Sequence, residues 1–193
     1  MSLLLLLAAA TAVQPARIVL VFAPDNGLTP VVVAAATREA DAIWSGCGVA
    51  VVFEQDSRFQ PDNGRAHSAG YAQVILVSIA ARQARLRSRD GALGEVRFTD
   101  GKAAGPITIY FDALMRLVQG STLAGATESQ WPALLRERIV GRALGRVLAH
   151  EIGHIVLQSG RHTPNGLMRA SYPGADLIEP GRRQFVIDVP EPF

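Results

Sequence analysis

Two histidines and a glutamate in the segment His150-Glu151-Ile152-Gly153-His154 have the residue types and the spacing of a hydrolytic metal site. Residues four apart on an α-helix lie one turn along the same face, so both imidazoles can reach one ion. Glu151 projects about 100° round the helix from His150, which places it beside the metal and not among the ligands. A carboxylate in that position is a candidate general base, so the segment predicts zinc-assisted peptide hydrolysis.

A long amphipathic helix, from about Glu128 to Gln158, is predicted to carry these residues. Apolar side chains recur along it at intervals of three and four positions. They are Leu134, Leu135, Ile139, Leu144, Val147, Leu148, Ile152, Ile155 and Val156. Four arginines are expected on its solvent side, namely Arg136, Arg138, Arg142 and Arg146. Three glycines, which cost helix stability, favour close approach to another element, expected to be a sheet: Gly141, Gly145 and Gly153.

The segment that follows the helix returns a third imidazole towards its end. Gly160 is predicted to adopt the left-handed conformation of a helix stop, which brings His162 back. A turn-rich run, Thr163-Pro164-Asn165-Gly166-Leu167, then leads to Met168.

At this point the chain resembles the metzincin clan of zinc endopeptidases, and residues 162–168 resemble the segment from the last ligand to the Met-turn of the matrix metalloproteinases. The resemblance implies that His150, His154 and His162 hold Zn²⁺, that Glu151 is the general base, and that Met168 forms an apolar floor beneath the metal. The family places its last histidine six residues after the second, whereas His162 lies eight residues after His154. A slightly longer helix followed by a tighter loop would absorb the two extra residues.

Two alternatives stay open at the level of sequence. The pentapeptide also resembles that of the thermolysin-like clan, in which a later glutamate is the third ligand, and Glu179 is the candidate for that role. The function could also be that of a zinc-stabilised, non-catalytic module that binds peptides. Tyr172 lies four residues past Met168, whereas the assisting tyrosine of some metzincins lies two past the methionine, so the family pattern assigns it no role.

Composition is that of an ordinary globular domain. The chain has 193 residues, 49% of them hydrophobic and 19% charged, with a net charge of +2 that gives no reason to expect nucleic acid as a partner. Cys47 is the single cysteine, so no intramolecular disulfide can form. We expect a single catalytic domain over residues 13–193, acting as a monomer, with an upper part to about residue 158 and a Met-turn subdomain over 159–193.

The amino terminus resembles a secretory signal peptide over residues 1–12. The apolar run Leu3–Ala10 is too short to span a membrane, and Ala10-Thr11-Ala12 has the small-x-small pattern of a cleavage site. A secreted or periplasmic location is therefore predicted.

Between these segments the hydrophobic pattern predicts an α/β (α+β) fold. Strands are expected at Arg17–Ala23, Val49–Glu54, Tyr71–Ile79, Leu93–Phe98 and Pro106–Phe111, with a helix over Thr29–Ser45 and a polar loop over Ser57–Gly70 that contains a solvated His67. The metzincin resemblance implies a twisted, mostly parallel sheet with one antiparallel edge strand, a backing helix, the metal-bearing helix and a small C-terminal subdomain. It also implies that the edge strand, at residues 92–98, binds a polypeptide substrate as one more strand.

Overall fold

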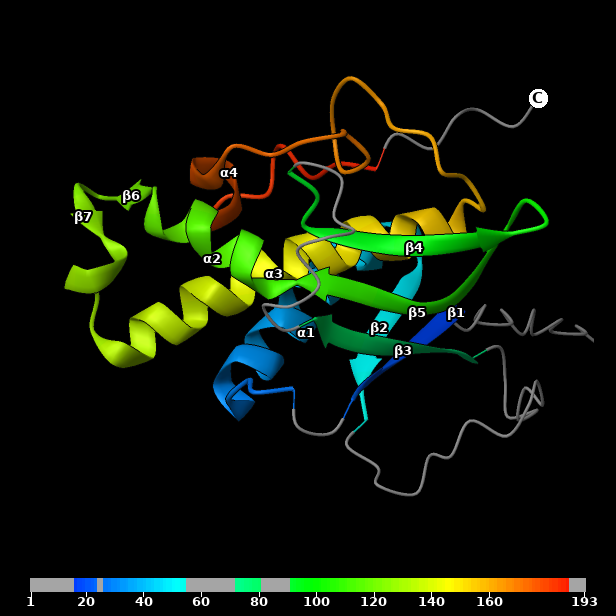
Figure 1. Ribbon diagram of the computed structural model, residues 1–193, viewed down its shortest axis with the longest axis horizontal. Coiled ribbons are helices and arrows are strands. Elements are labelled where there is room, and N and C mark those ends of the chain that lie inside the picture. Colours follow the sequence, from blue (N-terminus) through cyan, green and yellow to red (C-terminus); the bar gives the residue numbers. More distant parts are fainter. Residues whose placement is uncertain (1–15, 24–25, 55–71, 81–90, 188–193) are drawn as a thin grey trace, which may run out of the picture.

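A five-stranded sheet with the order β2-β1-β3-β5-β4 forms the centre of the protein (Figure 1). The computed structural model describes residues 16–23, 26–54, 72–80 and 91–187. The predicted signal segment and the predicted loop with His67 lie outside these ranges. The strands are β1 (Ala16–Phe22), β2 (Val49–Phe53), β3 (Ala72–Ala80), β4 (Gly94–Thr99) and β5 (Lys102–Tyr110).

The pairing of the strands confirms the predicted mixed α/β architecture. Strand β1 pairs in parallel with β2 and β3, and β3 pairs in parallel with β5. Strand β4 runs antiparallel to β5 and forms one edge of the sheet. The segment predicted to be an antiparallel edge strand therefore has that position.

Local capping explains where the first helix lies. Helix α1 (Pro30–Trp44) follows Thr29, whose hydroxyl oxygen accepts a hydrogen bond from the backbone N–H of Val32 at 3.3 Å. Proline at the first helical position lacks only an N–H that would have no partner there. A short 3₁₀ turn ends at Gly48, whose φ of 72° allows the chain to reverse into β2.

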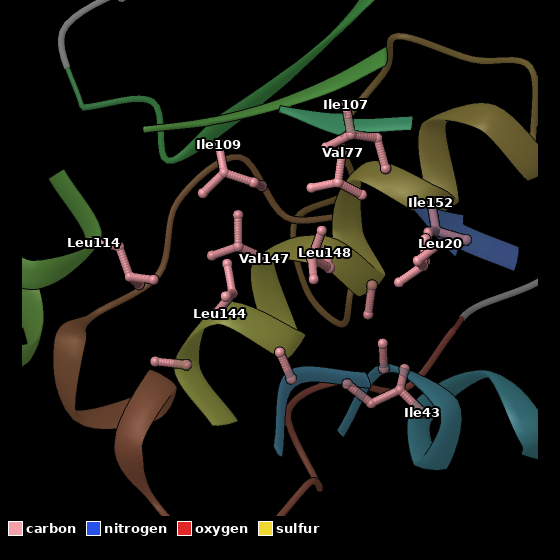
Figure 2. Close-up of a cluster of buried hydrophobic side chains, with 14 of the residues drawn as sticks. Leu20, Ile43, Val77, Ile107, Ile109, Leu114, Leu144, Val147, Leu148 and Ile152 are labelled. Carbon is pink, nitrogen blue, oxygen red and sulfur yellow. The ribbon is translucent and has the colours of Figure 1, made fainter. Parts of the chain in front are cut away.

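The hydrophobic core lies between the sheet and the helices. Figure 2 shows Val77 and Ile107 of the sheet pointing toward Leu148 of α3 (Ala133–Val156), with Ile43 of α1 beyond that helix. Each of these four side chains is at most 8% exposed. Helix α3 is thus covered on two sides, which explains why almost every residue from Ile139 to Ile155 is buried.

The helix that carries His150 and His154 is shorter than the sequence pattern predicts. Residues Glu128–Gln130 form a separate 3₁₀ turn, and α3 begins only after Pro132, because proline favours an extended residue before it. Leu134 and Leu135, which we assigned to the apolar face, are 51% and 42% exposed in the first turn of α3. That turn lies at the opposite end of the helix from His150 and His154.

Several short elements were not predicted. Helix α2 (Phe111–Gln119) directly follows β5, and its Leu114 and Val118 are fully buried. A two-stranded ribbon of β6 (Thr122–Leu123) and β7 (Ala126–Thr127) leads from α2 toward α3. Beyond α3 the chain forms loops and one short helix, α4 (Gly174–Ile178).

Two helical glycines allow α3 to pack against α1, and not against a sheet as we expected. A Cβ atom at Gly141 would lie 2.5 Å from Cβ of Ala35, and one at Gly145 would lie 2.5 Å from the carbonyl oxygen of Ala36. Neither distance is compatible with van der Waals contact, so the two helix backbones touch directly at these positions.

Arg146 is buried, and its predicted place on the solvent side of the helix is wrong. Its Nε donates to Glu39 Oε1 at 2.9 Å, and its two terminal nitrogens donate to the carbonyl oxygens of Asp176 and Gly181. The second carboxylate oxygen of Glu39 accepts from Arg182 at 2.8 Å. This charged network joins α1, α3 and the C-terminal segment.

In the described ranges, no helix has both the length and the apolar character that crossing a bilayer requires.

Replacing Arg146 should destabilise the protein far more than replacing its neighbour in the network. We expect Arg146→Met to lower the free energy of unfolding by about 3–5 kcal/mol, because it leaves Glu39 and two carbonyl groups buried with fewer partners. Arg182 is 48% exposed, so Arg182→Met should cost about 1 kcal/mol or less. Urea denaturation of the two variants measures the difference, and equal losses would contradict a buried role for Arg146.

Candidate metal centre

Three histidine side chains converge where the C-terminal end of α3 meets the loop that follows it. His150 and His154 lie one turn apart on α3, are 7% and 6% exposed, and have their Nε2 atoms 3.1 Å apart. The ring of His162 is centred 5.3 Å from that of His150 and 5.1 Å from that of His154. All three offer a nitrogen within 4.8 Å of the others, so together they could hold one metal ion.

Backbone carbonyl groups determine which nitrogens carry protons. Nδ1 of His150 donates to the carbonyl oxygen of Leu167 at 2.8 Å, and Nδ1 of His154 donates to that of Ser159 at 2.6 Å. A carbonyl oxygen only accepts, so in the neutral imidazoles both Nε2 atoms present lone pairs. Burial lowers the pKa of His150 to about 4 and also lowers the pKa of His154, which favours these neutral forms.

Two lone pairs that face each other at 3.1 Å need an electrophile between them. Nitrogens bound to one tetrahedral zinc ion at about 2.0–2.1 Å lie about 3.3 Å apart, close to the separation of the two Nε2 atoms. Hydrogen bonds from the far nitrogen of each ring to a carbonyl are also typical of metal-bound histidines. The donor set therefore fits a metal ion.

The chain reverses after α3 at Gln158, and not at Gly160 as predicted. Gln158 has a φ of 47°, whereas Gly160 is not among the residues with positive φ. The Gln158 side chain stabilises this strained backbone by donating to the Ile155 carbonyl at 2.6 Å and accepting from the Ala103 N–H at 3.0 Å. The extra residues before His162 thus form a turn, and they do not lengthen the helix.

Met168 packs against helix α3 at Gly153, the residue before His154. It is 5% exposed, and a Cβ atom at Gly153 would overlap its sulfur. A turn over residues 163–168 places Met168 at this position. The Thr163 N–H donates to the Met168 carbonyl at 2.8 Å, and Gly166 has a φ of 74°. The predicted close approach at Gly153 therefore exists, and its partner is Met168 together with Trp44.

Glu151 lies beside the three histidines but is not one of the side chains that could hold the ion. It is 4% exposed and borders a cavity of about 580 Å³ that His150, His154 and His162 also line. A Cβ atom at Gly94 of β4 would lie 2.8 Å from Glu151 Oε1, so the edge strand touches this carboxylate. Burial, and then the nearby Glu95 carboxylate, raise the pKa of Glu151 to about 8. A cation held by the histidines would favour its ionised form again.

The structure separates the two candidates for the third ligand. His162 belongs to the histidine group, whereas Glu179 is an exposed residue at the end of α4 and neither joins that group nor lines the cavity. This arrangement favours His162.

Tyr172 was assigned no role from the sequence, and the structure places its hydroxyl next to His150. Its oxygen lies 3.1 Å from His150 Nδ1 and donates to the same Leu167 carbonyl. The ring stacks on that of Phe185, with their centroids 5.4 Å apart, and the Arg169 guanidinium lies 4.5 Å from the centroid of Tyr172 and 5.9 Å from that of Phe185. Tyr172 therefore supports the outer side of His150, a contact that no local spacing could have indicated.

Searches against protein-family models, curated protein sequences and solved structures find no match to this chain. The metzincin resemblance therefore rests on the motif and on the geometry described above.

Removing His162 should abolish tight metal binding. We expect His162→Ala to weaken zinc affinity by at least ~10³-fold, because two ligands from one helix cannot fix a tetrahedral ion. Glu179→Ala serves as the control and should bind zinc like the unaltered protein. Competition with a chromophoric chelator measures both. Zinc retained by His162→Ala and lost by Glu179→Ala would instead support the thermolysin-like arrangement.

Proposed function

We propose that the protein is a zinc-dependent endopeptidase, secreted or periplasmic, that hydrolyses peptide bonds. The observation that carries the proposal is the pairing of three converging imidazoles with a buried carboxylate, Glu151, that is not one of the ligands. A structural zinc site is usually closed by four protein ligands and rich in cysteine. It has no need of a carboxylate held beside the metal.

Zinc is the ion we propose for this donor set. Imidazole also suits copper, iron and nickel, but three histidine ligands with an open fourth position are typical of catalytic zinc. When bound, zinc supplies a Lewis acid that polarises the scissile carbonyl and lowers the pKa of water. Glu151 would accept a proton from the attacking water and return it to the leaving nitrogen.

Strand β4 is proposed to align the substrate. Among the described strands it pairs only with β5, so the N–H and C=O groups on its other edge are available to an extended peptide. Its first residue, Gly94, touches Glu151, and its Phe98 ring lies 6.5 Å from that of His154. A peptide added along this edge would therefore pass across both the proposed base and the histidines.

The role of Glu151 can be tested by a change that keeps its shape. We expect Glu151→Gln to retain one zinc per chain and to lower peptide hydrolysis by ~10²–10⁴-fold, the usual contribution of a positioned acid–base group. Glu179→Gln is the matched control and should keep full activity. Cleavage of an unfolded protein substrate and metal analysis give the two readouts. A zinc-loaded protein that cleaves no peptide would support the alternative of a non-catalytic binding module.

The contact between β4 and Glu151 gives a second test. A Cβ atom at Gly94 would lie 2.8 Å from Oε1 and 3.0 Å from Cγ of Glu151, so that side chain must then move. We expect Gly94→Ala to keep its zinc and thermal stability but to lose activity by roughly tenfold or more, because catalysis is sensitive to misplacement of about 1 Å. Gly46→Ala, at a position with open space around it, is the control. Unchanged activity in Gly94→Ala would contradict this placement of Glu151.

A further inference from the structure

A second carboxylate, that of Glu95, faces the cavity beside the histidines. Within the part of the chain that the structure describes, the residues that line the cavity include Glu95 and Glu151 and no Lys or Arg. Glu95 follows Gly94, the residue in contact with Glu151, and its charge is near enough to act on the Glu151 carboxylate. Among the described residues, the β4 side of the cleft is therefore lined by acidic and no basic residues.

Contacts within the protein leave the charge of Glu95 largely uncompensated. Its nearest described cation is Arg97, whose Nε lies 4.0 Å away and whose side chain is 76% exposed. An ion pair of that length and exposure contributes little. The other neighbour is the Tyr110 hydroxyl, whose pKa is raised to about 12 by burial and then by Glu95. Tyr110 can help to hold the carboxylate in place, but it brings no positive charge.

The Glu95 side chain is 38% exposed, so it can meet a ligand without a rearrangement of the strand. It is also the second residue of the strand along which we propose that the substrate lies. Any substrate group opposite it would enter a negative, partly desolvated region, where opposite charge is favoured and like charge is penalised.

We propose that Glu95 selects substrates with a positively charged group on the β4 side of the cleft, either a Lys or Arg side chain or the terminal amine of a peptide. The inference rests on the proposed peptidase function and adds a substrate class to it. A site that favours side chains would make the enzyme an endopeptidase with a preference for basic residues. A site that favours the terminal amine would direct cleavage to the ends of peptides.

The test uses matched peptides that differ only in charge. One set compares an internal Lys with norleucine, which has a similar chain without the charge, and a second compares a free with an acetylated terminus. We expect the unaltered enzyme to prefer the charged member of one set by roughly fivefold to tenfold in kcat/KM, and the preference to fall in 1 M salt. The set in which the preference appears identifies the source of the charge.

Variants connect that preference to Glu95. Glu95→Gln should bring the ratio for charged and neutral peptides close to one, and Glu95→Lys should favour a peptide with Glu in place of Lys. Glu179→Gln should leave the ratio unchanged. Equal cleavage of charged and neutral peptides by the unaltered enzyme, or a preference that persists in Glu95→Gln, would overturn the inference while leaving the peptidase function intact.

A binding measurement separates failure of the inference from failure of the function. If no peptide is cleaved, the peptidase proposal fails. The same labelled peptides can still be titrated into zinc-loaded Glu151→Gln protein by fluorescence anisotropy. Tighter binding of the charged peptide, lost when Glu95→Gln is added, would support selection by Glu95. Equal binding of charged and neutral peptides would overturn it.

Discussion

Helix α3 packs so closely on its neighbours at three glycines that no side chain would fit between them. Gly141 and Gly145 bring its backbone against α1, and Gly153 brings it against Met168. Because interiors are close-packed and yield little, these contacts define the position and rotation of α3. The same helix carries His150 and His154 one turn apart, so its packing also determines where a metal could be held.

The charged groups behind the helix extend this constraint to the C-terminal segment. Arg146 joins α3 to Glu39 of α1 and to the carbonyl groups of Asp176 and Gly181. A buried guanidinium is stable only when its donors find partners in a fitting geometry, so it favours one arrangement of the segment after α3. That segment supplies the Leu167 carbonyl, which orients His150.

Burial around the site has opposite effects on the pKa values of its two helical histidines, His150 and His154, and of the Glu151 carboxylate. It favours neutral imidazoles, whose lone pairs can bind a cation, and it disfavours an ionised Glu151 until a cation is near. The edge strand closes the other side of Glu151 through Gly94 and places Glu95 next to it. Contacts between α3 and β4 thus place His150, Glu151 and His154 beside the edge strand of the sheet.

The sequence by itself determined the features that lie within a single helix or strand. His150, Glu151 and His154 share a helix, and runs of Val, Ile and Leu form the strands. These features depend on spacing along a single segment. The tertiary structure decided which distant segments contact one another. It buried Arg146 against Glu39, placed the chain reversal at Gln158, and brought Tyr172 next to His150. Periodicity identifies an apolar face but not what covers it, and contacts between distant segments exist only after the chain has packed.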